Sequence, residues 1–202
     1  MEFLRLLEGL RTPFFDTVFA AVTHLGEETF FMVLAILLFW CINKRCGYYC
    51  FFVGFAGTAI NQFLKLLCRI PRPWVLDPDF TIVEAARAQA TGYSFPSGHT
   101  QNAVGTFAVL GLATKKKWLK ILCAVLIIIV PFSRMYLGVH YPADVLFSLV
   151  VSTALVFALY ALYSRGEGIS RRFRISFFLV AALSFAFVLF VNLHTWPANI
   201  EI

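Results

Sequence analysis

The sequence predicts an all-α, polytopic membrane protein, a bundle of six transmembrane helices preceded by a short amphipathic helix. Composition is the first observation: 60% of the 202 residues are hydrophobic and only 14% are charged, and the mean hydropathy is +0.79. A soluble domain carries about 25% charged and 45–50% apolar residues. The second observation is that several runs approach the ~20 apolar residues needed to cross ~30 Å of hydrocarbon. We expect residues 1–202 to form one membrane-embedded domain.

The N-terminal region predicts helices that lie at or near the membrane surface. Over residues 2–11, apolar residues recur at helical spacing between charged ones, which is typical of a short amphipathic interfacial helix. Pro13 marks a fresh helix start, so residues 13–24 form either a second interfacial piece or the beginning of the first span. Glu27 and Glu28 are expected to be solvated at the membrane edge, with the alternative that one of them faces a site.

Six apolar runs follow, most of them bounded by basic residues or by proline. A polar, proline-containing segment over residues 69–95 separates the second run from the third, and its prolines end the preceding helix. The predicted spans cover residues 28–43, 47–68, 97–114, 118–133, 142–163 and 175–193.

The basic residues predict the orientation of these spans. Six spans place both termini on one side, and ten of the 17 lysines and arginines then lie on the other side. Of the remaining seven, three are assigned to chemistry below, which leaves four. The positive-inside rule makes the first, third and fifth loops cytoplasmic and turns the second and fourth outward. The net charge of +6 is thereby explained without a nucleic-acid partner. The ten residues are Lys44, Arg45, Lys115, Lys116, Lys117, Lys120, Arg165, Arg171, Arg172 and Arg174.

The cysteines give no sign of a disulfide framework or a metal centre. There are five of them, an odd number, mostly in apolar context, and no CxxC or Cys/His metal-ligand spacing appears. Small apolar packing residues are the favoured interpretation.

Polar residues gather at the ends of four consecutive spans. Because consecutive spans run antiparallel, the end of the second, the start of the third, the end of the fourth and the start of the fifth all lie at one membrane face. Ionisable groups inside a membrane are expensive, which makes them functional candidates. The residues concerned are Lys65, Arg72, Ser97, Gly98, His99, Arg134, His140 and Asp144.

The chemical character of this set favours a phosphate group. Lys65, Arg72 and Arg134 supply three cations, and arginine offers paired donors that match phosphate oxygens. Ser97 and Gly98 open a helix, where free backbone N–H groups and the helix dipole favour an anion. Glycine also lets the backbone approach a ligand closely.

Two histidines add the groups that phosphoryl transfer needs. His140 and Asp144 are four residues apart across the start of a helix that opens at Pro142. The aspartate can take the proton on one imidazole nitrogen and leave the other free to attack or to accept a proton. Of His99 and His140, one can then attack phosphorus while the other protonates the departing oxygen. No carboxylate cluster is present to hold a metal, so we expect no metal and no cofactor, and the cations would stabilise the transferring group.

These residues fall into three segments that resemble the signature motifs of the type 2 phosphatidic acid phosphatase (PAP2) family. The segments are Lys65 to Pro73, Pro96 to His99 and Ser133 to Asp144; they occur in order over about 80 residues. The resemblance implies a helical bundle with metal-independent hydrolysis. It implies that His140 is the nucleophile and forms a phosphohistidine, that Asp144 orients it and that His99 is the acid. It also implies phosphate binding by Lys65, Arg72, Ser97, Gly98 and Arg134. The roles of Ser133 and Arg69 stay open.

We therefore expect an integral membrane lipid phosphatase whose site opens at the outer leaflet. It would remove the terminal phosphate of undecaprenyl pyrophosphate, phosphatidylglycerol phosphate or phosphatidic acid; the small size and outward site favour a polyprenyl pyrophosphate. Its partners are the lipid substrate and the bilayer, and the sequence leaves the oligomeric state open. Two alternatives remain: transfer of the phosphoryl group to an acceptor other than water, and a scramblase or carrier that only binds lipid phosphates.

Overall fold

The computed structural model describes residues 1–163 and 169–193, and over these residues it is all-helical, as predicted. Arg165, counted above among the cytoplasmic basic residues, lies outside them. The α-helices are α1 (Glu2–Gly9), α2 (Pro13–Thr23), α3 (Glu28–Leu37), α4 (Lys44–Cys68), α5 (Pro73–Leu76), α6 (Gly98–Ala113), α7 (Lys117–Tyr136), α8 (Pro142–Tyr163) and α9 (Ile169–Leu193). The 3-10 turns η1 (His24–Gly26) and η3 (Glu84–Ala86) and the π-helical turn η2 (Leu38–Ile42) complete the elements.

Fewer helices than predicted are long and apolar enough to cross a membrane. Four such spans lie in the described residues, and a fifth is formed if two segments bent by 52° count together. The difference is α6, which has 16 residues and therefore spans only ~24 Å at 1.5 Å per residue. The count of six stays a prediction. The four spans are Lys44–Leu76, Lys117–Tyr136, Pro142–Ala161 and Arg174–Leu193, and the bent pair is Pro13–Gly26 with Glu28–Ile42.

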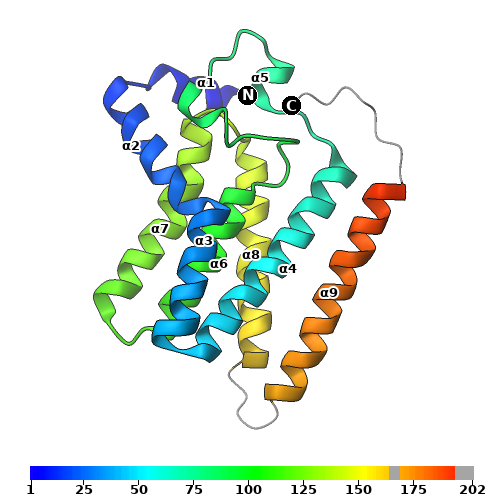
Figure 1. Cartoon of the computed structure of the whole chain (residues 1–202). Coiled ribbons are helices and arrows are strands. Elements are labelled where there is room, and N and C mark those ends of the chain that lie inside the picture. The colour runs from blue at the N-terminus through cyan, green and yellow to red at the C-terminus, as the bar shows by residue number, and fades with distance from the viewer. Residues whose placement is uncertain (164–168, 194–202) are drawn as a thin grey trace.

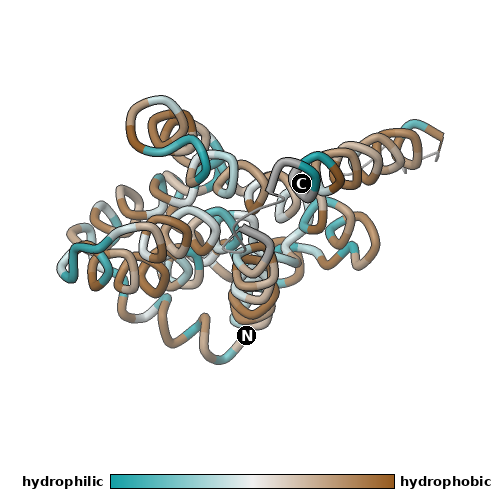
Figure 2. The backbone as a smooth tube through the Cα atoms, turned by 90° about the horizontal axis from the view of Figure 1, so that it is seen from below, coloured by the Kyte–Doolittle hydropathy of each residue, from teal (hydrophilic) through white to brown (hydrophobic). Residues whose placement is uncertain are grey.

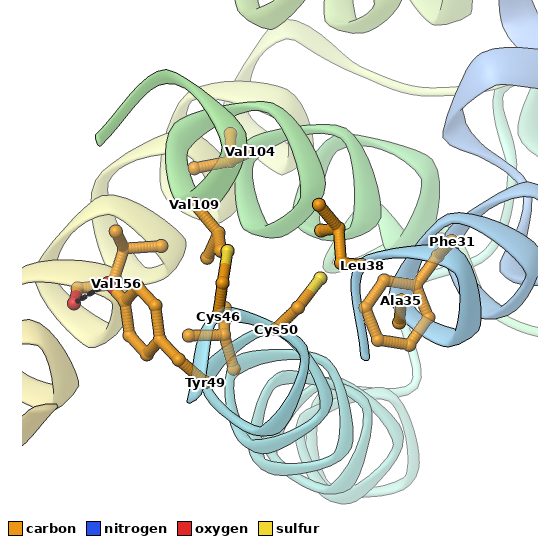
Figure 3. Packing of buried hydrophobic residues seen from close by; sticks show 10 residues of the cluster. Phe31, Ala35, Leu38, Cys46, Tyr49, Cys50, Val104, Val109 and Val156 are labelled. Carbon is orange, nitrogen blue, oxygen red and sulfur yellow. Dashed lines mark hydrogen bonds between the residues drawn. The ribbon is translucent and has the colours of Figure 1, made fainter. Parts of the chain in front are cut away.

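The short helix α6 lies at the centre of the bundle, packed against α3, α4, α7 and α8, with α9 outside beside α4 (Figure 1). Hydrophobic residues cover most of the helices (Figure 2). Figure 3 shows how α3, α4, α6 and α8 meet in one apolar cluster. There Tyr49 of α4 donates its hydroxyl proton to the carbonyl of Val156 on α8, at 2.6 Å. This packing satisfies a buried polar group and fixes α4 against α8.

Four helix ends meet at one end of the bundle. The C-terminal end of α4, the N-terminal end of α6, the C-terminal end of α7 and the N-terminal end of α8 lie together there, with α5 and the segment from residue 69 to 97 (Figure 1). The alternating helix directions inferred from the sequence require this arrangement. It brings the three motif segments to a common region.

The N-terminal helix α1 is tied to the polar segment between α4 and α6. Its apolar face includes Leu4 and Leu7, which are buried. Arg5 forms an ion pair with Asp77 at 2.6 Å, and Glu8 accepts hydrogen bonds from the backbone and hydroxyl of Thr81. Asp77 thereby ties α1 to this segment.

Candidate active site

The motif segments surround a polar cavity of about 260 Å³ at this end of the bundle. Both glutamates of the α2–α3 junction also line it, together with several amides. Ser97, Arg134 and Asp144 are buried behind the cavity wall. The sequence-predicted residues that line the cavity itself are Lys65, Arg72, Gly98, His99 and His140.

A tight turn between α7 and α8 separates Arg134, on the last turn of α7, from His140. After α7 ends, Gly138 adopts a φ of +81°, a left-handed conformation that favours glycine. A Cβ at Gly138 would also lie 2.6 Å from a guanidinium nitrogen of Arg11. The Val139 N–H then donates to the Arg134 carbonyl at 3.1 Å, which closes the turn. The motif spacing between Arg134 and His140 is therefore the length of this turn.

His140 is held between a carboxylate and a guanidinium group. Its Nδ1 lies 3.3 Å from Oδ2 of Asp144, and its Nε2 lies 3.2 Å from Nη1 of Arg72. The carboxylate oxygen also accepts from the Tyr141 N–H at 2.9 Å and the Ser94 hydroxyl at 2.5 Å. Because Asp144 accepts and Arg72 donates, this network assigns the ring proton to Nδ1 and a lone pair to Nε2.

The surroundings of His140 favour its neutral form. Its side chain is 2% exposed. Burial, followed by the charges of Arg72 and Arg134, lowers the pKa of His140 well below its ordinary value. A neutral imidazole whose Nε2 carries no proton has the electronic form that a nucleophile requires.

Backbone carbonyls fix the guanidinium of Arg72. It donates to Val139 at 2.8 Å, Gly92 at 3.0 Å and Thr91 at 2.7 Å, in addition to the His140 ring. The α4–α6 segment and the α7–α8 turn are thereby joined through one planar cation. Lys65, on the last turns of α4, donates to the Tyr93 carbonyl of the same segment.

Arg134 and His99 carry buried side-chain nitrogens that have no hydrogen-bond partner among the described residues. Arg134 is fully buried; its Nη1 donates to the Thr23 hydroxyl at 2.7 Å, whereas its Nε and Nη2 have no partner. Nε2 of His99 is also buried and unpaired. Buried polar groups are nearly always hydrogen-bonded. A cationic group and a histidine left in this state around a polar cavity fit an anionic ligand.

The start of α6 leaves room for such a ligand. Ser97 caps the helix, and its hydroxyl oxygen accepts from the Thr100 N–H at 3.4 Å. At Gly98, the nearest atom to an added Cβ is Oδ1 of Asn61, at 3.8 Å. Packing therefore does not require glycine there. A side chain would instead occupy space beside the free N–H groups of the helix N-terminus.

Several residues of the site could not be assigned to it from the sequence. Glu27 and Glu28 both line the cavity, as in the alternative that one of them faces a site, and Glu28 is also exposed. Glu27 is paired with His24 at 2.6 Å. Ser94 and Thr23, which hold Asp144 and Arg134, carry no local signal, because each pairs with a residue far away in the chain.

Two residues with open roles do not line the cavity. The Ser133 hydroxyl donates to the Val130 carbonyl of its own helix at 2.6 Å. Arg69 ends α4 in a left-handed conformation with a φ of +51°, and its Nε donates to the Leu66 carbonyl at 3.0 Å. Among the described residues, no group of three His, Cys, Asp or Glu side chains is placed to hold a metal ion.

Comparison with known proteins places these segments in one family. Undecaprenyl-diphosphatase BcrC of Bacillus subtilis (strain 168) is 32% identical over 161 residues, which are 77% of this chain and 80% of that protein. Phosphatidylglycerophosphatase B of the same organism is 29% identical over 153 residues, or 68% and 70% of the two chains. Relatives named phosphatases and diphosphatases identify the chain as a lipid phosphatase of the membrane.

The family model described as the PAP2 superfamily matches residues 45–167. The chain belongs to this superfamily. Two crystal structures share its fold. One is the transmembrane PAP2 type phosphatidylglycerolphosphate phosphatase from Bacillus subtilis, with a TM-score of 0.69, 26% identity and coverage of 82% of this chain and 84% of that one. The other is Aquifex aeolicus LpxE, also with a TM-score of 0.69, 25% identity and coverage of 79% and 93%.

Proposed function

We propose that the chain hydrolyses the terminal phosphate of a membrane lipid phosphate or pyrophosphate through a phosphohistidine intermediate at His140. The proposal rests on the position of the proton on the His140 ring. Asp144 accepts from Nδ1, so Nε2 is unprotonated, and its lone pair accepts from Arg72 at the wall of a cavity lined by cations. Membership of the PAP2 superfamily and relatives named as phosphatases support the same chemistry.

In the first step, the terminal phosphate binds among Lys65, Arg72 and Arg134 and against the N-terminus of α6. Nε2 of His140 attacks phosphorus and forms a P–N bond as the bond to the bridging oxygen breaks. His99 donates a proton to that oxygen, so the lipid alcohol or lipid monophosphate leaves. Asp144 stabilises the positive charge that develops on the imidazole ring. The cations balance the charge on the phosphoryl oxygens.

In the second step, water replaces the departed lipid. His99, now deprotonated, takes a proton from the water molecule as its oxygen attacks phosphorus. The P–N bond breaks, His140 recovers its lone pair and inorganic phosphate leaves. The same histidine thus acts first as acid and then as base, which restores the enzyme without a net change in protonation.

The relatives support a membrane lipid phosphate as the substrate class. Two are named for undecaprenyl diphosphate and phosphatidylglycerophosphate, and one for the 4'-phosphate of lipid A. Undecaprenyl pyrophosphate, phosphatidylglycerol phosphate and phosphatidic acid are the candidates, and we favour the polyprenyl pyrophosphate. We place the site on the outer face of the cell membrane, with six spans and with the first, third and fifth loops cytoplasmic.

Phosphate release by the purified protein across a panel of lipid mono- and diphosphates tests this proposal, with the His140→Ala variant as the blank. Release from at least one lipid, abolished in the variant, supports it. Undiminished release by His140→Ala removes the nucleophile assignment. Product analysis in the presence of an alcohol acceptor distinguishes hydrolysis from phosphoryl transfer, because transfer yields a new phosphate ester in place of inorganic phosphate.

A further inference from the structure

A second cavity, an apolar groove of about 550 Å³, lies between α4 and α9. In Figure 1 these two helices run side by side at the edge of the bundle. The groove is walled mainly by aromatic and aliphatic side chains, which are exposed or half-buried. Its lining includes Phe51, Phe55 and Thr58 on α4, and Phe177, Ala181 and Val188 on α9.

The groove is continuous with the phosphate cavity. Thr58 and Gln62 line both of them. These two residues are four apart on α4, so they occupy neighbouring turns of one helix face. Lys65 follows Gln62 by three residues and lines the phosphate cavity. One stripe of α4 therefore runs from aromatic residues, through two neutral polar residues, to a cation.

This order matches the order of groups in a lipid phosphate. A hydrocarbon chain is favoured against Phe51 and Phe55, while the phosphate is favoured beside Lys65. From Tyr48 to Gln62, the helical rise amounts to ~21 Å at 1.5 Å per residue. That length exceeds half of the ~30 Å hydrocarbon thickness. A tail that fills the groove must reach past the middle of the bilayer.

We propose that the groove between α4 and α9 binds the hydrocarbon tail of the substrate, and that it fits one long polyisoprenoid chain. This inference rests on the proposed function, because it takes the phosphate cavity as the place of the headgroup. Any apolar groove in a bilayer is filled by hydrocarbon. The continuity through Thr58 and Gln62 is what favours the tail of the substrate over an ordinary bilayer lipid.

A bulky side chain at Ala181 tests the proposal. Ala181→Trp places an indole in the groove, whereas the matched control Ala182→Trp puts the same residue on the next position of α9, which does not line it. Phosphate release is measured in mixed micelles with undecaprenyl diphosphate, which has a long tail, and geranyl diphosphate, which has a short one. We expect Ala181→Trp to lower kcat/KM at least tenfold for the long tail and less than twofold for the short one. Ala182→Trp should stay within twofold of wild type on both.

The outcomes separate the two proposals. If the wild type releases phosphate but Ala181→Trp behaves like Ala182→Trp, the groove holds bilayer lipid only and the tail assignment is overturned. If the wild type releases phosphate from no lipid, the proposed function fails and the tail assignment fails with it.

A binding measurement covers the case in which Ala181→Trp does not fold. A polyprenyl diphosphate with a photoreactive diazirine on its tail is bound to the His140→Ala protein and irradiated. We expect labelled peptides from residues 48–62 and 177–188, and competition by unlabelled undecaprenyl diphosphate. Labelling confined to other helices, or equal competition by phosphatidylcholine at the same mole fraction, contradicts the proposal.

Discussion

Arg134 offers a test in which stability and activity should move in opposite directions. The guanidinium is fully buried, and it makes one hydrogen bond, to the hydroxyl of Thr23. Its Nε and Nη2 are without partners in the described part of the chain. If these donors are kept for the phosphoryl group, the protein carries an uncompensated charge whenever the site is empty. Arg134→Met should therefore stabilise the fold while it removes activity.

The magnitude follows from the burial of these groups. Replacing a buried ion pair by hydrophobic residues of similar volume often stabilises a protein by about 1–4 kcal/mol, and an unpaired buried charge should cost at least as much. Loss of the hydrogen bond to Thr23 reduces this gain in stability by about 1 kcal/mol. In a chain of this size, 1 kcal/mol shifts Tm by about 2–4 °C. We expect Arg134→Met to raise Tm by up to about 12 °C and to lower kcat by a factor of about 10²–10³, the loss typical of one transition-state donor.

Differential scanning fluorimetry in one detergent and at one scan rate measures the Tm, and phosphate release measures kcat. Orthovanadate, as a phosphate analogue, should raise the Tm of the wild type and leave that of Arg134→Met unchanged. Arg134→Lys is the matched control, because it keeps the charge without the planar fork and should gain no stability. A Tm of Arg134→Met well below wild type would show that the guanidinium is a structural group, and would refute the reasoning.

Three further predictions concern space, protonation and metals. Gly98→Ala should keep Tm within about 2 °C but lower kcat/KM at least tenfold, because its Cβ enters free space beside the helix N-terminus. The control variant Gly26→Ala should lower Tm instead, because its Cβ would lie 2.8 Å from a methyl carbon. Because the pKa of His140 is lowered, protonation of this nucleophile should cause no fall in phosphoenzyme formation between pH 8 and about 6.5, the ordinary histidine value. Stability should fall below that pH, since the unfolded chain then binds the extra proton; a rise in stability would contradict the assignment. Phosphate release should persist in EDTA, since Lys65 and Arg72 supply the positive charge, and a loss restored only by a divalent ion would contradict this.

The helices were predictable because apolar length and proline positions act locally. Pro142 opens α8 as the sequence predicts, and α8 ends at Tyr163. The number of spans was less predictable, because α6 has 16 residues and is surrounded by other helices. A helix inside a bundle does not need the length that contact with lipid demands.

The meeting of the motif segments was predictable from the alternating directions of the helices, but their supporting contacts were not. Ser94 holds Asp144 across 50 residues, and Thr23 holds Arg134 across 111. A serine or threonine in a loop or helix gives no sequence signal of such a partner. Glu27 illustrates the same limit, because only the packing of the α2–α3 junction on α6 turns it toward the cavity.

Transfer of the phosphoryl group to Nε2 of His140 is tested most directly by rapid-quench trapping. The enzyme is mixed with a lipid diphosphate carrying ³²P in its terminal phosphate, quenched in alkali within milliseconds and digested. We expect an acid-labile, base-stable label on the peptide that contains His140, and no label in His140→Ala. Full turnover by wild-type enzyme with the label on another residue, or with no label at any quench time, would contradict it.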